Sequence, residues 1–316
     1  VHDPLLRGRP QPAYPVASNC AMPTHIGFLG LGAIGTPMAR HLAIPGFALA
    51  VWNRTGDKAT AFAAAHPARA ASTPADAARG ADVVITCLPT SREVEALLDG
   101  PDGLLAGLAR GTLFVDCTSG DPATSKRIAA RLAEQGVAFI DAPVSGGVAG
   151  AEKGALTIMV GGDAAQLDRA MPVLRAMGEK VVHCGAVGAG DALKAVNNAL
   201  LAVHIWSAAE GLLALSKAGV KPEVALEVIN ASSGRSNSSM NLFPERVLTR
   251  AFPRTFRLAL LDKDVGIAAQ VARDQKVPSP LIQLTAELFR AAHVALGEQA
   301  DHVEAVKYLE TMAGEE

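Results

Sequence analysis

The chain contains 316 residues, of which 49% are hydrophobic and 19% are charged, and its formal net charge at pH 7 is −2. A chain of this length can fold into two domains with a large core, and its nearly neutral charge argues against nucleic acid or an anionic membrane surface as partners. The four cysteines and eight histidines have no metal-ligand spacing. We therefore expect no bound metal and a reducing, cytoplasmic location.

The first 21 residues are rich in proline and lack the continuous apolar segment of a secretory signal. Met22 stands just before the first apolar run of the chain. We expect residues 1–21 to be a disordered extension outside the fold, and the sequence leaves open whether they belong to the native protein.

Residues 25–54 have the pattern of a strand, a glycine turn, a helix and a second strand. The turn is a G-x-G-x-x-G, in which the first glycine allows a tight turn, the second lets the backbone approach a pyrophosphate, and the third lets the helix pack closely. Free N–H groups at the start of the helix then face the diphosphate. The pattern predicts that a dinucleotide binds along Gly30, Leu31, Gly32, Ala33, Ile34 and Gly35.

The end of the second strand bears on the choice between NAD and NADP. An NAD-binding unit usually presents Asp or Glu to the adenosine ribose at this point, but this strand ends in Trp52-Asn53-Arg54-Thr55, without a carboxylate. Asn53 and Thr55 can donate hydrogen bonds to a 2′-phosphate, and Arg54 can add charge-assisted ones. We expect NADP to be the preferred cofactor, with NAD as the alternative.

Beyond Arg54, strand-like and helical segments alternate as far as residue 183. This order predicts a Rossmann-type, doubly wound parallel sheet, in which ligands bind beyond the carboxyl ends of the strands. Such a sheet brings three segments to the edge where the glycine loop lies, namely Leu88-Pro89, Thr118-Ser119 and Ser145-Gly146-Gly147. The strands expected after residue 54 are 82–88, 112–117, 138–144, 156–160 and 180–183, with helices at 57–65, 75–79, 93–98, 123–135 and 164–177.

The second half of the chain is different, because no strand pattern follows residue 190. Helical periodicity runs from residue 191 to 218, about 42 Å at 1.5 Å per residue, and further helices are expected at 222–231, 242–249, 262–274, 280–295 and 302–312. We divide the chain into a dinucleotide-binding domain, residues 22–187, and an all-helical substrate and oligomerisation domain, residues 188–316. The longest apolar stretch within it, residues 199–215, is interrupted by polar residues and is short for a membrane span, so we expect a buried helix. A homodimer or homotetramer would cover part of this long, apolar helix.

Lys194 lies near the start of this long helix, with Asn197 and Asn198 on the same face three and four residues further on. A helical lysine is usually a solvated surface residue. Here the helix is otherwise apolar, and asparagines on an apolar helix are costly unless they are hydrogen-bonded. A cleft that holds a polar substrate would supply those partners.

Four motifs carry a resemblance to a known family: residues 27–38 (GFLGLGAIGTPM), 141–147 (DAPVSGG), 188–198 (GAGDALKAVNN) and 262–265 (DKDV). From Met22 to nearly the C-terminus the chain resembles the β-hydroxyacid dehydrogenase family, and within it the 3-hydroxyisobutyrate dehydrogenases most closely. The resemblance implies an NAD(P)-dependent oxidation of a small 3-hydroxy acid, with 3-hydroxyisobutyrate converted to methylmalonate semialdehyde as the first expectation.

The same resemblance implies roles for individual residues. Lys194 would be the general acid/base, and Asn198 would help to hold the substrate beside it. Asp264 would support the closed substrate cleft. The substrate carboxylate would be bound by Ser145, Gly146 and Gly147, and the cofactor would be lined by Leu88, Pro89 and Ser119 and reached by Lys263.

The chain departs from the family pattern at three places. Ile34 stands where Met is common, Thr118-Ser119 reverses the usual Ser-Thr order, and the segment after Trp52 replaces the Asp of the NAD-using mammalian type. We expect the substrate side-chain pocket to be built from residues 232–241 and Phe256.

Three enzyme alternatives and one non-enzyme remain. A reductase of small aldehyde acids such as glyoxylate, succinic semialdehyde or tartronate semialdehyde would use the same residues in reverse. An imine reductase usually lacks the lysine at position 194, and a 6-phosphogluconate dehydrogenase relative would have His in place of Asn197. A non-catalytic nucleotide-sensing module would have little reason to keep Lys194, Asn198 and the Ser145 turn together.

Overall fold

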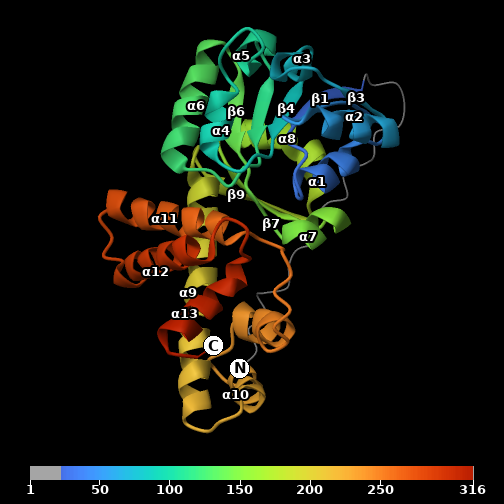
Figure 1. Cartoon of the computed structure of the whole chain (residues 1–316). Helices are drawn as coiled ribbons and strands as arrows, with labels where there is room; N and C mark the ends of the chain where they lie inside the picture. The colour runs from blue at the N-terminus through green and yellow to red at the C-terminus, as the bar shows by residue number, and fades with distance from the viewer. Residues whose placement is uncertain (1–22, 316) are drawn as a thin grey trace, which may run out of the picture.

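The computed structural model describes residues 23–315, so the prediction for residues 1–21 lies outside the described part of the chain. Figure 1 shows an α/β part from the first half of the chain and a helical part from the second, with one long helix, α9 (Ala189–Lys217), running through both. The α/β part consists of β1 (Thr24–Leu29), α1 (Gly35–Leu42), β2 (Phe47–Trp52), α2 (Gly56–Ala65), β3 (Ala68–Ala70), α3 (Pro74–Ala78), β4 (Val83–Thr86), α4 (Ser91–Ala96), α5 (Leu104–Gly107), β5 (Leu113–Asp116), α6 (Pro122–Glu134), β6 (Ala138–Asp141), β7 (Val144–Ser145), α7 (Gly147–Lys153), β8 (Thr157–Gly161), α8 (Ala164–Met177) and β9 (Lys180–Gly185). The helical part adds α10 (Pro222–Asn230), η2 (Ser238–Val247), α11 (Leu258–Asp274), α12 (Pro280–Leu296), η3 (His302–Glu304) and α13 (Ala305–Met312) to α9.

Within residues 23–315, nine strands form one sheet in the order β3-β2-β1-β4-β5-β6-β8-β7, with β9 paired to β8. The strands β1 to β6 are parallel, which confirms the predicted Rossmann-type sheet. The structure corrects the prediction for the last strands, because β8 is antiparallel to β6 and β7 and parallel to β9. The connection from β6 to β8 consists of the short strand β7 and the seven-residue helix α7, so the chain turns back and makes no full crossover.

The two faces of the sheet are both covered, which explains why β4 and β5 are buried at every position and apolar except at their last residues, Thr86 and Asp116. Alternate residues enter two separate cores: Phe28 and Ile85 face the core under α1 and α8, whereas Leu29 and Val84 face the core under α3, α4, α5 and α6. With both faces covered, the ends of the strands are the remaining places where a ligand can reach the sheet.

Helix α9 organises the helical part. Figure 1 shows α11, α12, α13 and α10 arranged along it, and contacts between α9 and each of these helices form a second core. Its N-terminal end packs against β8 and β9, so α9 belongs to both parts of the molecule. The division between residues 187 and 188 stays a prediction.

Several elements differ from the sequence-based expectation. The predicted helix 242–249 is a π-helix, η2, and α11 begins at Leu258, four residues before its predicted start. The short elements β3, β7, α5 and α7 were not predicted. Elements of two to seven residues contain too little of either period to be recognised.

Candidate active site

The glycine loop follows β1 at the carboxyl edge of the sheet and has the geometry of a phosphate-binding turn. Gly30 has a φ of +109°, and a Cβ at this position would clash with the Cys87 carbonyl. Gly35 begins α1 and lies against Gly30 O, so the third glycine lets the helix start directly on the loop. Around the corresponding Cβ position of Gly32, no atom of a described residue other than its chain neighbours lies within 4 Å. This side of the loop is therefore open to a diphosphate, as a dinucleotide requires.

The end of β2 is tied to the glycine loop by Asn53. Its Oδ1 accepts a hydrogen bond from the Leu31 N–H at 2.9 Å, and its Nδ2 donates to Thr55 O at 3.1 Å. We predicted Asn53 as a donor to the cofactor, and the structure adds that it holds the loop in place. One N–H of Nδ2 is left over for a ligand.

A hollow of about 410 Å³ lies beside this strand end. Arg54 lines it, is exposed, and has no hydrogen bond or ion pair with any residue in the described part of the chain. No carboxylate is found among the described lining residues, which are Trp52, Asn53, Arg54, Gly56, Thr60, Ala70, Ala71 and Ser72.

The loops after β4 and β5 are joined to each other along the same edge. The Leu88 N–H donates to Thr118 Oγ1 at 3.1 Å, and the Thr118 N–H donates to Asp116 Oδ1 at 3.0 Å. Ser119 is half-buried, and its carbonyl accepts a hydrogen bond from Lys263 Nζ of α11. Residues predicted from both halves of the chain therefore meet at the loop after β5.

The Ser145-Gly146-Gly147 turn is the connection between β7 and α7. Ser145 pairs with Thr157 of β8, Gly146 has a φ of +134°, and α7 begins at Gly147. The sequence predicted only the turn, because α7 is short and contains two glycines, which are poor helix formers. Backbone N–H groups at the start of α7 suit the binding of a carboxylate.

Lys194 lies in the second turn of α9 and is only 9% exposed. Burial lowers the pKa of its ammonium, the Asp264 carboxylate acts in the opposite direction, and the Lys263 ammonium adds to the lowering. Within residues 23–315, no group forms a hydrogen bond or an ion pair with Lys194 Nζ. A buried amine of lowered pKa with no partner is suited to exchange a proton with a bound ligand.

Asp264 is the centre of a polar network beside Lys194. Its Oδ1 pairs with Lys263 Nζ at 2.9 Å, and its Oδ2 accepts a hydrogen bond from Asn198 Nδ2 at 2.6 Å. Asn198 is buried, and its Oδ1 accepts a hydrogen bond from the exposed Asn197 at 3.1 Å. The partners expected for the two asparagines are thus supplied in part by the protein itself. The positions of these residues are consistent with the predicted site. Their individual roles stay predictions.

Three buried carboxylates under this edge have no role predicted from the sequence. Asp116 ends β5, Asp141 ends β6, and Asp191 lies in the first turn of α9. Asp141 was part of a recognised motif, and a glycine-rich segment before a long helix calls for a capping acceptor from elsewhere. These two signals together would have indicated Asp141.

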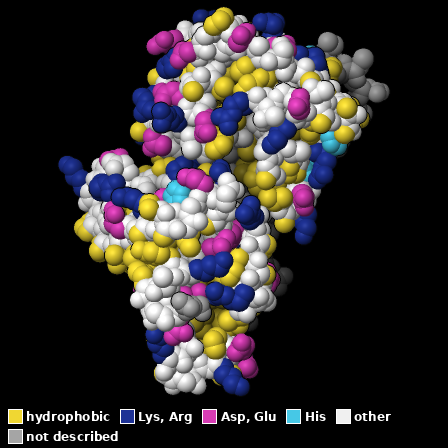
Figure 2. Space-filling view, viewed as in Figure 1, with side chains coloured by type: hydrophobic (Ala, Val, Ile, Leu, Met, Phe, Trp, Pro, Cys, Tyr) yellow, Lys and Arg dark blue, Asp and Glu magenta, His cyan; other side chains and the backbone are white. Residues whose placement is uncertain are grey.

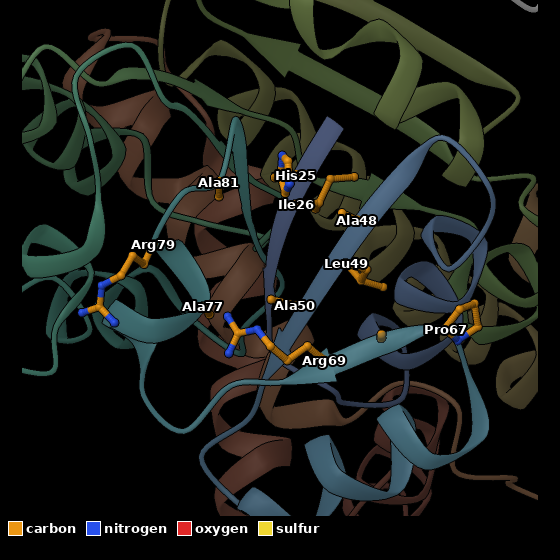
Figure 3. A pocket seen from close by; sticks show the side chains of 11 residues that line it. His25, Ile26, Ala48, Leu49, Ala50, Pro67, Arg69, Ala77, Arg79 and Ala81 are labelled. Carbon is orange, nitrogen blue, oxygen red and sulfur yellow. The ribbon is translucent and has the colours of Figure 1, made fainter. Parts of the chain in front are cut away.

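Figure 2 shows Lys, Arg, Asp and Glu side chains close together where the α/β and helical parts meet. Another hollow, of about 420 Å³, lies on the sheet face toward the amino ends of β1, β2 and β3, and Figure 3 shows its alanine-rich lining with Arg69 and Arg79 at the rim. It contains none of the predicted site residues.

Two family models match most of the chain. Residues 25–185 match the NAD binding domain of 6-phosphogluconate dehydrogenase, and residues 188–309 match the NAD-binding domain of NADP-dependent 3-hydroxyisobutyrate dehydrogenase. The chain is 37% identical over 290 residues to 2-(hydroxymethyl)glutarate dehydrogenase of Eubacterium barkeri, with 92% of this chain and 96% of that protein covered. It is 39% identical over 271 residues to the NAD-dependent L-serine dehydrogenase of Pseudomonas aeruginosa, with 84% and 91% covered.

A solved structure is similar over nearly the whole chain. The Mycobacterium tuberculosis 3-hydroxyisobutyrate dehydrogenase, determined with L-serine, has a TM-score of 0.82 and 33% identity, covering 91% of this chain and 99% of that chain. The fold, the site and these relatives define an NAD(P)-dependent oxidoreductase that acts on CH–OH groups. The chain belongs to the β-hydroxyacid dehydrogenase family, which confirms the resemblance seen in its motifs.

Proposed function

We propose that the protein is an NADP-preferring dehydrogenase of small 3-hydroxy acids, with 3-hydroxyisobutyrate as the first candidate substrate and methylmalonate semialdehyde as its product. The observation that carries the proposal is Lys194, a buried amine with a lowered pKa and no protein partner within residues 23–315, beside Asn198 and Asp264. A bound nicotinamide supplies the hydride acceptor in oxidation. Neutral Lys194 accepts the hydroxyl proton as the carbonyl forms, and returns it in the reductive direction.

The names of the relatives support this substrate class. 2-(Hydroxymethyl)glutarate, L-serine and 3-hydroxyisobutyrate are all carboxylates that carry a CH₂OH group on the carbon next to the carboxylate, and they differ only in the other substituent of that carbon. In our proposal the Ser145-Gly146-Gly147 turn binds the carboxylate and Lys194 meets the hydroxyl. The pocket for the substituent, predicted at residues 232–241 and Phe256, would select among the three.

Initial-rate kinetics with these three acids, each with NADP and NAD, test the proposal. Lys194→Ala should lower kcat by about two to four decades, the usual contribution of a general acid/base, while cofactor binding is retained. Unchanged turnover in that variant would remove Lys194 from the mechanism. Turnover only with aldehyde acids and NADPH would favour the reductase alternative, and cofactor binding without turnover on either panel would favour a nucleotide-sensing module.

The preference for NADP rests on Arg54, which lines a hollow at the end of β2 without a partner in the described chain and without a carboxylate in the described lining. Among the relatives, one family description names NADP and one enzyme name specifies NAD, so they do not decide the cofactor. Arg54→Ala should lower kcat/KM for NADP about tenfold and leave that for NAD within about twofold. Arg79→Ala, at the exposed rim of the hollow in Figure 3, is the matched control. An equal effect on both cofactors would contradict the 2′-phosphate role.

We also propose that the protein is a homodimer or homotetramer. Helix α9 is long and apolar enough to span a membrane, yet only 33% of its most apolar window is buried within one chain. Large apolar side chains are exposed on α9 and α12, including Leu200, Leu281, Leu284 and Val294, the last with 80% of its surface exposed. A second copy packed on these helices would cover them. Light scattering after size-exclusion chromatography tests this, and a monomer at micromolar concentration would contradict it.

A further inference from the structure

Helix α9 has no capping side chain of its own. Its N-cap residue is Gly188, with a φ of +92°, so the acceptors for the first free N–H groups must come from elsewhere in the chain. Asp141, at the end of β6, supplies them. Its Oδ1 accepts from the Gly188 N–H at 2.7 Å and its Oδ2 accepts from the Asp191 N–H at 3.0 Å. One carboxylate therefore holds the start of α9 against the edge of the sheet.

Asp191 continues this connection toward the loop after β5. Its Oδ1 accepts a hydrogen bond from the Gly120 N–H at 3.0 Å, and its Oδ2 accepts one from Ser125 Oγ of α6 at 2.6 Å. Gly120 directly follows Ser119, whose carbonyl is bound by Lys263. The loop predicted to line the cofactor is thus held by Asp191 of α9 at Gly120 and by Lys263 of α11 at Ser119.

Asp191 and Lys194 are three residues apart and both buried, so they share one face of α9. The hydrogen bond that the Gly120 N–H donates to Asp191 therefore connects the face of α9 that carries Lys194 to the loop after β5. Gly190 allows this close packing, because a Cβ there would clash with the Met159 carbonyl of β8.

Burying the carboxylates of Asp141 and Asp191 costs the fold free energy. Asp141 is fully buried and Asp191 is 1% exposed, and neither forms an ion pair with a cation in residues 23–315. Burial raises the pKa of both carboxyls, and Asp141 raises that of Asp191 further. Two unpaired buried carboxylates are a poor way to stabilise a helix terminus, which a serine or asparagine would cap at lower cost.

We propose that Asp141 and Asp191 are positioning residues for the dehydrogenase reaction, which together hold Lys194 at the distance from the cofactor loop that proton and hydride transfer require. This inference rests on the proposed role of Lys194. Displacing a reacting group by about 1 Å can cost about 10²-fold in rate, so the effect belongs to kcat. The KM of the hydroxy acid should change less, because the turn proposed to bind its carboxylate, Ser145-Gly146-Gly147, forms no hydrogen bond with Asp191 in the described chain.

Asparagine substitution distinguishes the two positions. The side chain introduced by Asp191→Asn keeps an oxygen for the Gly120 N–H, and its amide can donate to Ser125 Oγ, so this variant should recover most of the rate. At position 141 both carboxylate oxygens accept from backbone N–H groups, and an amide nitrogen cannot. Asp141→Asn should therefore lower kcat by about 10- to 100-fold, and Asp191→Ala should do the same.

The experiment measures kcat, KM and the pH profile of kcat/KM for the wild type, Asp141→Asn, Asp191→Asn, Asp191→Ala and Ser125→Ala. Ser125→Ala is the control, because it leaves the Gly120 contact in place and should stay within about threefold of the wild type. The slow variants should keep the hydroxy-acid KM within about threefold and the same pH midpoint, because the charges that act on Lys194 are those of Asp264 and Lys263. If Asp191→Ala does not fold, the contrast between the two asparagine variants decides.

Amide hydrogen exchange of residues 188–198 in the same variants needs no turnover, so it separates this inference from the proposed function. It should be at least about tenfold faster in Asp141→Asn and Asp191→Ala than in the wild type. Unchanged exchange would overturn the inference even if the wild type oxidises no hydroxy acid. It would also be overturned by a wild-type kcat in a folded Asp191→Ala, by a loss confined to KM, or by equal losses in both asparagine variants.

Discussion

The charges around Lys194 predict that replacing either of two neighbouring residues shifts the pKa of Lys194, in opposite directions. Asp264 raises the pKa of the Lys194 ammonium and Lys263 lowers it. Replacing Asp264 by Asn removes the charge that favours the ammonium and keeps an oxygen for Asn198. Replacing Lys263 by Met removes the charge that opposes it. The pKa of Lys194 should therefore fall in Asp264→Asn and rise in Lys263→Met.

The size of the two shifts follows from the burial of the site. Two unit charges about 6 Å apart interact by about 3 kcal/mol at an effective dielectric constant of about 20, which is about two pK units. Asp264 is only 2% exposed, so solvent screens it little, but it shares its charge with Lys263 at 2.9 Å. We therefore expect the pKa of Lys194 to move further down in Asp264→Asn than it moves up in Lys263→Met.

The assay is kcat/KM for hydroxy-acid oxidation against pH at saturating NADP. The value should rise with pH as Lys194 loses its proton, with a midpoint below the ordinary lysine pKa of 10.5. Because every variant is measured with the same bound cofactor, the charge of the nicotinamide affects all midpoints alike. Shifts of the same sign in the two variants would show that these two charges do not control the pKa of Lys194, and an unaltered profile in Lys194→Ala would show that Lys194 does not produce the pH dependence.

Three further predictions concern the sheet edge. Burial raises the pKa of Asp116 from 3.8 to about 6, so the stability that this carboxyl contributes is present below about pH 4 and is lost as the pH rises through 6. The free energy of unfolding, measured in urea at about pH 4 and pH 7.5, should therefore differ between the two pH values by about 3 kcal/mol less in Asp116→Asn than in the wild type. Gly190→Ala should lower the free energy of unfolding by about 2–3 kcal/mol, because its Cβ meets the Met159 carbonyl, and an unchanged melting temperature would contradict the close packing of α9. Asn53→Ala leaves the Leu31 N–H without its partner, so the Kd of NADP and NAD should both rise about tenfold in fluorescence titration, whereas a change for one cofactor alone would mean that Asn53 acts by contacting it.

Much of the fold was predictable because its signals are local. The glycine turn, the buried strands β4 and β5 and the long helix α9 each show their own period over enough residues to be recognised. The direction of β8 was not predictable, because it depends on how the chain returns after β6. The π-helical geometry of η2 and the early start of α11 likewise arise from packing against α9 and the neighbouring helices, which a single segment does not encode.

The candidate site was likewise predictable only in part. The residue types at the site, including Lys194, Asn198 and the glycines of two turns, could be read directly, because motifs keep chemistry and spacing together. Their partners could not. Asp264 reaches Asn198 across 66 residues of sequence, and Asp141 reaches the start of α9 across about 50.

The motifs and their order along the chain are therefore enough to define the class of this protein: a dinucleotide-binding sheet, a helical second domain and a lysine on the helix that joins them. The protonation and position of that lysine depend on the folded chain. Burial lowers its pKa, the Asp264 carboxylate on α11 raises it, and the Lys263 ammonium beside Asp264 lowers it further. Carboxylates on β6 and α9 hold its position. Burial and distance are properties of the folded chain, because they depend on which distant segments come into contact.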